Sequence, residues 1–175
     1  MSKRVSLTVS CPVAALVGAL LATQAMAGRG EAPDAREPAS RMSLIIIEGL
    51  PGSDALLKGD YEAGLSEALA ALERSPNRRV AELSNNICAA QAKLGEFDRA
   101  TDYCEIALST RPSMLSMQQH EAIALVNRGV VQALQGERVA ANADFGRAAD
   151  LFVDLGVARS NFAMTQAADR VFVDE

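Results

Sequence analysis

The sequence has no tryptophan, a single histidine and few aromatic residues, which make up 4% of the chain, although hydrophobic residues make up 49%. A core of this composition is built mainly from Ala, Leu, Val and Ile, which favours closely packed helices over aromatic-rich sheets. The single imidazole, His120, has no second histidine to complete a histidine-based metal site. Its position beside Glu121 in a helix-forming stretch predicts a solvent-facing side chain. The 175 residues are enough for one modest all-α domain.

Motifs that cradle phosphates or build common hydrolytic sites are also missing. The sequence contains no GxxxxGK[ST], no GxGxxG, no GxSxG and no HExxH. The formal net charge of -5 disfavours a phosphate-binding surface. Acidic side chains are numerous, but they recur at helical spacing, as on the solvent-exposed face of a bundle. We therefore expect no enzyme activity, no catalytic residue, no metal, no cofactor and no nucleic-acid partner.

The first 27 residues have the features of a secretory signal peptide. Lys3 and Arg4 give a positive start, residues 11–22 form an apolar run, and Ala25-Met26-Ala27 matches a small-x-small cleavage site. The run is shorter than the ~20 residues of a comfortable membrane span. We expect cleavage before Gly28, export to the periplasm or beyond it, and no membrane span in the mature chain. A retained membrane anchor is the alternative.

Two short segments separate this leader from the rest of the chain. Residues 28–42 are rich in Gly, Pro and charge, which predicts a flexible linker. The apolar run SLIIIEG follows at residues 43–49. It fits a strand or a docking segment equally well, and the sequence does not decide between them.

Three turn glycines, Gly59, Gly95 and Gly136, reveal a repeat in the remaining sequence. Each is followed by an acidic residue, and small residues recur seven positions before, five after and twelve after each glycine. Glycine ends a helix because it tolerates a left-handed conformation, and an acidic residue favours the positive start of the next helix. Pro76 and Pro112 then close the first two units, since proline cannot continue a helix. The pattern predicts antiparallel helical hairpins.

This pattern resembles the tetratricopeptide repeat, a helix–turn–helix unit of about 34 residues. The resemblance is strongest over residues 81–112, where the family's key positions are held by Cys88, Gly95, Phe97, Ala100, Ala107 and Pro112. It implies a short α-solenoid of antiparallel helix pairs within residues 43–175. Its expected parts are units at about 52–76, 81–112 and 122–153, and a C-terminal capping helix at about 157–171.

Two departures from the repeat carry structural predictions. Pro51-Gly52 stands where the first unit should begin its opening helix, so that helix should be short or missing. The second and third turn glycines are separated by seven residues more than the period, about two helical turns. Ser116 and Gln119 fit a capping box. We therefore expect a lengthened helix that runs to about Gln135.

Cys88 and Cys104 are predicted to lie at one height of a helical hairpin, since they stand seven residues before and nine after Gly95. A disulfide needs Cα atoms roughly 4.4–6.8 Å apart, closer than the usual 8–10 Å between helix axes. Small neighbouring residues make that approach feasible. Two outcomes stay open: a disulfide formed in an oxidising compartment, or two small buried thiols.

The resemblance also implies a binding groove, because opening helices of successive tetratricopeptide units line a concave face that holds peptides or partner segments. Asn86 and Asn127, nine residues before their turn glycines, match the family's ordinary structural pattern. The implied groove residues are Glu82, Asn85, Ala89, Ala92 and Lys93 from the second unit, and Ile123, Val126, Val130, Ala133 and Leu134 from the third.

The third-unit set is apolar and suits an amphipathic helix or an extended peptide. The alternative is that the C-terminal helix or a second copy of the chain covers it. The sequence thus predicts a non-catalytic protein-interaction scaffold of the cell envelope that binds a peptide or partner protein. Self-association as a homodimer is the alternative function.

Overall fold

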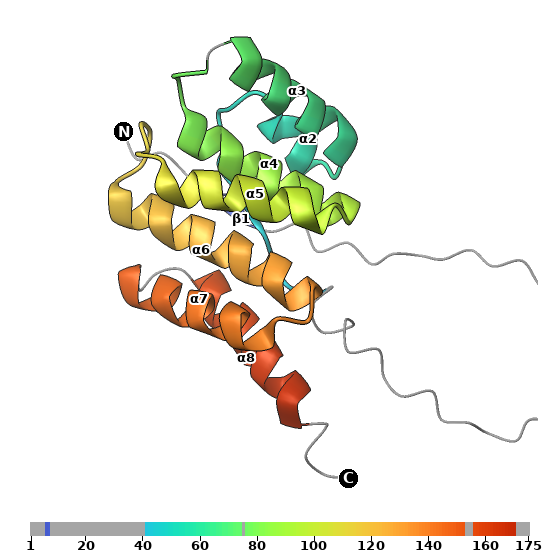
Figure 1. Cartoon of the computed structure of the whole chain (residues 1–175), viewed down its shortest axis with the longest axis vertical. Coiled ribbons are helices and arrows are strands. Elements are labelled where there is room, and N and C mark those ends of the chain that lie inside the picture. Colours follow the sequence, from blue (N-terminus) through green and yellow to red (C-terminus); the bar gives the residue numbers. More distant parts are fainter. Residues whose placement is uncertain (1–5, 8–40, 75, 153–155, 171–175) are drawn as a thin grey trace, which may run out of the picture.

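The computed structural model describes residues 6–7, 41–74, 76–152 and 156–170. These residues are helical apart from turns, connections and one two-stranded sheet, so the predicted all-α class is confirmed. The predicted signal peptide (1–27) and linker (28–42) lie almost wholly outside the described residues. The helices are α2 (Ser53–Leu57), α3 (Tyr61–Arg74), α4 (Val80–Leu94), α5 (Phe97–Ser109), α6 (Met117–Leu134), α7 (Arg138–Leu151) and α8 (Gly156–Arg170), and the strands are β1 (Ser6–Leu7) and β2 (Ile45–Ile46) (Figure 1).

The helices pack in chain order. Each contacts the next one along the sequence, and α4 also contacts α6, as α6 contacts α8. Because of these skipped contacts, α4, α6 and α8 form one layer. Within the described residues, no helix has the length and apolar character needed to cross a membrane.

The turn glycines behave as the sequence predicts. Gly59, Gly95 and Gly136 have φ angles of 85°, 79° and 87°, a region that side chains with a Cβ atom rarely adopt. Gly95 is the C-cap of α4, and its N–H bonds back to the carbonyl of Ala92. Three helical hairpins can therefore turn sharply at these positions.

The two predicted departures from the repeat are also confirmed. The opening helix of the first unit, α2, has only five residues. The third unit opens with α6, the longest helix at 18 residues, whose C-cap is Gln135. Ser116 and Gln119 form the capping box at its start, with the Gln119 N–H donating to Ser116 Oγ at 3.2 Å.

Small residues set how closely α6 and α7 approach. Gly129 of α6 faces Phe145 of α7, and a Cβ added at Gly129 would lie 2.6 Å from Cε1 of that ring. The Phe145 side chain is fully buried. The glycine therefore provides the space that the aromatic ring occupies.

Cys88 of α4 and Cys104 of α5 form a disulfide. The sulfur atoms are 2.02 Å apart and the Cα atoms 5.3 Å apart. Of the two outcomes that the sequence leaves open, the structure has the bond, and the prediction of equal height on the hairpin is confirmed.

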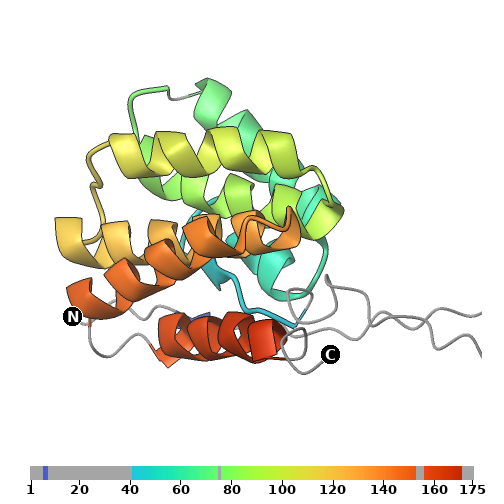
Figure 2. The same cartoon turned by 60° about the horizontal axis from the view of Figure 1, so that its bottom comes forward.

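The apolar run before α2 is interior. Residues 42–50 pass along α4 and α6, and Figure 2 shows this cyan segment between α8 and the teal and green helices. Six of its large side chains are at most 9% exposed: Met42, Leu44, Ile45, Ile46, Ile47 and Leu50. Even-numbered Met42, Leu44 and Ile46 join one core cluster, and Ile45, Ile47 and Leu50 join the other. The sequence left open whether this run is a strand or a docking segment. It is both: it contains the short strand β2 and packs into the core of the domain.

His120 is 2% exposed, so the prediction of a solvent-facing side chain is wrong. Its helix α6 packs against α4, and the first turn of α6 lies near Ala81 and Glu82 at the start of that helix. Burial lowers the pKa of His120; a hydrogen bond with the Ala81 backbone and the charge of Glu82 act in the opposite direction. Helical spacing alone does not reveal which face a neighbouring helix covers.

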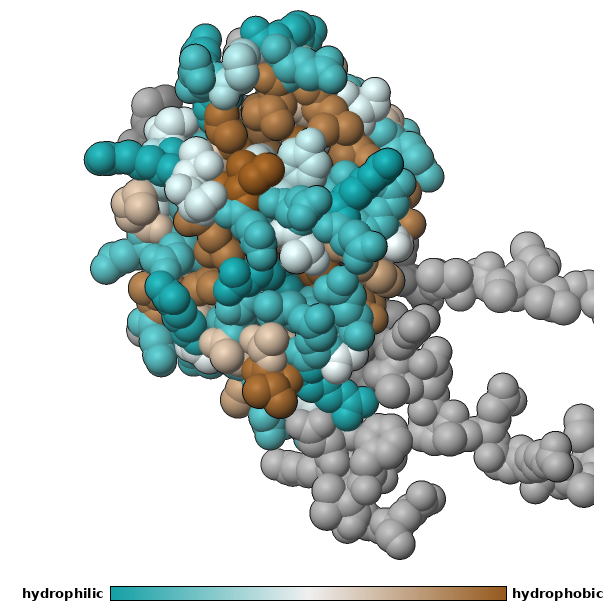
Figure 3. Space-filling view, in the orientation of Figure 1, coloured by the Kyte–Doolittle hydropathy of each residue, from teal (hydrophilic) through white to brown (hydrophobic). Residues whose placement is uncertain are grey.

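The outer surface carries few large apolar side chains. Figure 3 shows mainly hydrophilic groups on the face toward the viewer, with smaller hydrophobic areas among them. Among the described residues, the exposed large hydrophobic side chains are Ile106, Met117, Val139 and Phe162. They come from four different helices, so they do not identify a binding face.

Candidate functional site

Three asparagines, one each from α4, α6 and α8, hold the backbone of the extended segment. Each side-chain amide accepts a hydrogen bond from the N–H of one residue and donates one to the C=O of the same residue. A neighbouring strand would satisfy the same two groups. The pairs are Asn86–Ile47 (2.8 and 2.8 Å), Asn127–Ile45 (2.7 and 2.8 Å) and Asn161–Ser43 (3.0 and 2.9 Å). We call this set the asparagine ladder.

The ladder is fully buried and internally connected. Asn86, Asn127, Asn161 and the neighbouring Asn85 are all 0% exposed. Asn85 donates to the Ile45 carbonyl at 3.2 Å and accepts from Asn127 Nδ2 at 3.0 Å. The backbone groups of Ile45 and Ile47 therefore find partners where no water reaches them, which a buried backbone requires.

The repeat explains how these asparagines come together. Asn86 and Asn127 stand at the same position of two successive units, nine residues before the turn glycine. The helices that carry them, α4 and α6, contact each other, and both side chains bond to the same extended segment. Asn161 takes the same role from α8 without such a glycine, and the sequence pattern did not single it out.

The other edge of the extended segment is also defined. Strand β1 pairs with β2 in antiparallel orientation, with Ser6 opposite Ile46 and Leu7 opposite Ile45. The N–H and C=O of Ile45 point toward the asparagine ladder, so those of the next residue, Ile46, point the other way. Ser6–Ile46 is therefore the hydrogen-bonded pair. We call the side of β2 that faces β1 its outer edge.

Several of the residues predicted to line a groove lie beneath this segment. Asn85 bonds to it directly, and Ile123, Val126 and Val130 share core clusters with its apolar side chains. Residues 42–50 of the same chain cover this face, and the C-terminal helix α8 adds to the cover through Val157, Ala158 and Asn161. Of the predicted groove residues, Lys93 and Leu134 are half-buried. The other eight side chains are at most 6% exposed: Glu82, Asn85, Ala89, Ala92, Ile123, Val126, Val130 and Ala133.

Glu82 does not take part in holding the segment. Its carboxylate accepts hydrogen bonds from the backbone N–H groups of Ser113, at 2.6 Å, and Met114. These contacts fasten the connection between α5 and α6 to the start of α4. Its role is structural, and the expectation that it lines a binding surface has no contact to support it.

The site can bind backbone, and its donors and acceptors are amides. Among the described residues, no group of three or more His, Cys, Asp or Glu side chains is placed to hold a metal ion. No protein-family model matches the chain, and comparison with curated proteins finds no match. The hydrogen bonds from the ladder to the segment all go to main-chain atoms, so they do not depend on the side chains of the segment.

Proposed function

We propose that this chain is an exported, non-catalytic protein-interaction scaffold of tetratricopeptide type, which binds an extended segment of a partner protein in the cell envelope. The asparagine ladder carries this proposal. Its support is that paired hydrogen bonds hold an extended segment of this chain, whose alternate side chains enter the two core clusters on either side. The ladder holds residues 43–47 extended from one edge, and the partner strand pairs with their other edge.

Energetics favour addition to the segment over its replacement. Burying one large aliphatic side chain contributes about 1.5–3 kcal/mol, so six of them contribute roughly 9–18 kcal/mol at most. The whole stability of a domain is about 5–15 kcal/mol. A partner that expelled residues 42–50 would have to restore all of this, against a segment already attached to the domain. The segment is therefore a lasting part of the face.

The outer edge of β2 is the place where a partner strand adds. Ser6–Leu7 already pairs there, so the edge accepts an extended chain in antiparallel register. Cleavage before Gly28 would remove those two residues and leave the N–H and C=O of Ile46 without them. An unpaired strand edge is a ready template for another strand.

A synthetic peptide of residues 3–10, KRVSLTVS, tests this edge. The protein is purified after export and its N-terminus is determined by mass spectrometry, with Gly28 expected. Binding is followed by fluorescence anisotropy and by the amide resonance of Ile46. N-methylation at Ser6 removes the donor to Ile46 and should weaken binding about tenfold, the effect of about 1.4 kcal/mol.

N-methylation at Leu7 is the matched control. The Leu7 N–H points away from β2 in the observed register, so this peptide should bind like the unmodified one. Equal losses for both peptides, or no binding of the unmodified one, would contradict strand addition. Crosslinking in the protein's own cells then identifies the natural partner, whose segment should compete with the peptide.

Self-association is distinguished in the same experiment. If the exported protein is a dimer by light scattering and the peptide converts it to monomer, a second copy occupies the outer edge. A monomer that binds the peptide supports a different protein as the partner.

A further inference from the structure

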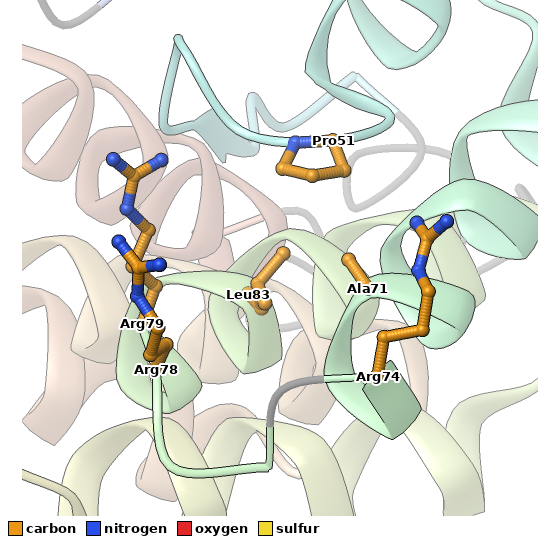
Figure 4. Close-up of a pocket in the computed structure, with 6 residues that line it drawn as sticks. All are labelled: Pro51, Ala71, Arg74, Arg78, Arg79 and Leu83. Atoms are coloured by element: carbon orange, nitrogen blue, oxygen red, sulfur yellow. The ribbon is translucent and has the colours of Figure 1, made fainter.

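A surface cavity of about 270 Å³ lies where α3 ends and α4 begins, and none of its lining residues belongs to the asparagine ladder. Three of its lining residues are arginines and none is acidic, although the chain has a net charge of -5. The lining residues are Pro51, Ala71, Arg74, Arg78, Arg79 and Leu83 (Figure 4). Positive charge is therefore concentrated at one small site of an acidic protein.

Two of these arginines are held in place by neutral acceptors. Arg79 Nη1 donates to the carbonyl of Gly49 at 3.3 Å, and Arg74 Nε donates to the carbonyl of Ala70 at 3.1 Å. In the part of the chain that the structure describes, the ion pairs involve Arg99, Arg128 and Arg147 and none of the cavity arginines. Carbonyl groups orient a guanidinium but do not neutralise it. Two of the cavity charges are thus positioned, and none of the three has a carboxylate partner among the described residues.

The arginines surround an apolar centre. Figure 4 shows Arg78 and Arg79 on one side of the cavity and Arg74 on the other, with Leu83 and Ala71 between them and Pro51 opposite. Arg79 is also the N-cap residue of α4, and no side chain there accepts from the first N–H groups of the helix. The positive end of the helix therefore adds to the field of the guanidinium groups.

We propose that this cavity binds a carboxylate carried on a small apolar body. A guanidinium group presents two parallel N–H donors that match the two oxygens of a carboxylate. The side chains of Leu83, Ala71 and Pro51 offer the remaining surface to an aliphatic group. Two sources have this chemistry: the C-terminal residue of a protein chain and a free short-chain acid. Carboxylate binding in this cavity does not require a partner strand at β2. The result of its test is therefore independent of the proposed function.

N-acetyl-L-leucine and N-acetyl-L-leucinamide test the proposal on the full chain. The two probes have the same shape and differ in the negative charge. Titration followed by the backbone amide resonances of Val80 and Ala81 should show saturable binding of the acid and none of the amide. Arg78→Gln removes a guanidinium that makes no hydrogen bond or ion pair with another described residue, and it should weaken binding about fivefold.

Arg99→Gln is the matched control, because it makes the same change of charge at an exposed arginine of α5. It should leave binding within about twofold, since exposed charges far from a site are screened. If Arg78→Gln alters the circular dichroism spectrum, Arg74→Gln takes its place with the same expected loss.

The source is decided by two further probes. An acetylated tetrapeptide that ends in leucine and binds more tightly than N-acetyl-L-leucine identifies a protein C-terminus as the ligand. Hexanoate that binds as tightly as the tetrapeptide identifies a free acid. Equal binding of the amide, unchanged binding by the folded Arg78→Gln protein, or displacement by chloride at the concentration of the probe would overturn the proposal.

Discussion

Replacement of Asn127 by alanine tests the asparagine ladder at its centre. Two buried groups lose their partners in this variant: the Ile45 N–H, bonded at 2.7 Å, and Asn85 Oδ1, bonded at 3.0 Å. The Ile45 carbonyl keeps its bond from Asn85 at 3.2 Å. Each buried group left without a partner costs about 1–3 kcal/mol, so the free energy of unfolding should fall by roughly 2–6 kcal/mol.

Urea unfolding of the full chain measures this loss, with the slope of the transition as a check that both proteins unfold in the same way. Asn127→Leu fills the same space without hydrogen bonds, so it should lose a similar amount and separate bonding from packing. Asn77→Ala, in an exposed turn, is the control and should change stability by no more than about 0.5 kcal/mol.

Hydrogen exchange at Ile45 distinguishes a local from a global effect. Its amide should exchange much faster in Asn127→Ala than in the parent protein, since the acceptor is gone. An Asn127→Ala protein with the stability of the Asn77 control and a still-protected Ile45 amide would refute the reasoning. The extended segment would then be held by its apolar side chains alone.

Three further outcomes follow from the fold. Reduction of the Cys88–Cys104 disulfide, which spans 16 positions, should lower stability by about 3 kcal/mol in urea unfolding with and without a reductant. Burial lowers the pKa of His120 below its ordinary 6.5, so the unfolded state binds more protons as the pH falls through 6.5. Stability should fall over that range and His120→Gln should remove this part of the pH dependence. Gly129→Ala should lower the free energy of unfolding by about 1–3 kcal/mol, because the added Cβ would lie 2.6 Å from an aromatic ring. Gly146→Ala is the matched control in α7: its added Cβ would have no atom within 4 Å, so it should raise the free energy of unfolding by about 0.5–1 kcal/mol. Thermal unfolding of the two variants measures the difference.

The repeated elements of this fold were predictable because their causes are local. Turn glycines, small residues at matched heights and the capping box at Ser116 act within one hairpin, where sequence spacing gives distance directly. The cysteine pair was predictable for the same reason. What the spacing could not fix is which faces are covered, as His120 shows.

The candidate site was harder to predict because its contacts join distant parts of the chain. The extended segment meets the ladder across 39, 82 and 118 positions of sequence. Asn86 and Asn127 were visible at equivalent repeat positions, yet an asparagine that bonds to a side chain of its own helix pair gives the same pattern. The apolar run at residues 43–49 was equally visible. Only the fold shows that the two belong together.

The asparagine ladder matches the spacing of residues along the extended segment to the spacing of the helices in one layer. Its contacts on the segment fall at residues 47, 45 and 43, while the asparagines come from successive helices of one layer, so the segment advances two residues for each helix and runs against their order. The number of helices in the layer therefore sets the length of the extended segment that they hold. A relative with one additional hairpin would need a segment longer by a dipeptide. An insertion of a single residue before Ile45 would place the backbone of Leu44, in place of Ser43, opposite Asn161 and would exchange the two faces of all preceding side chains.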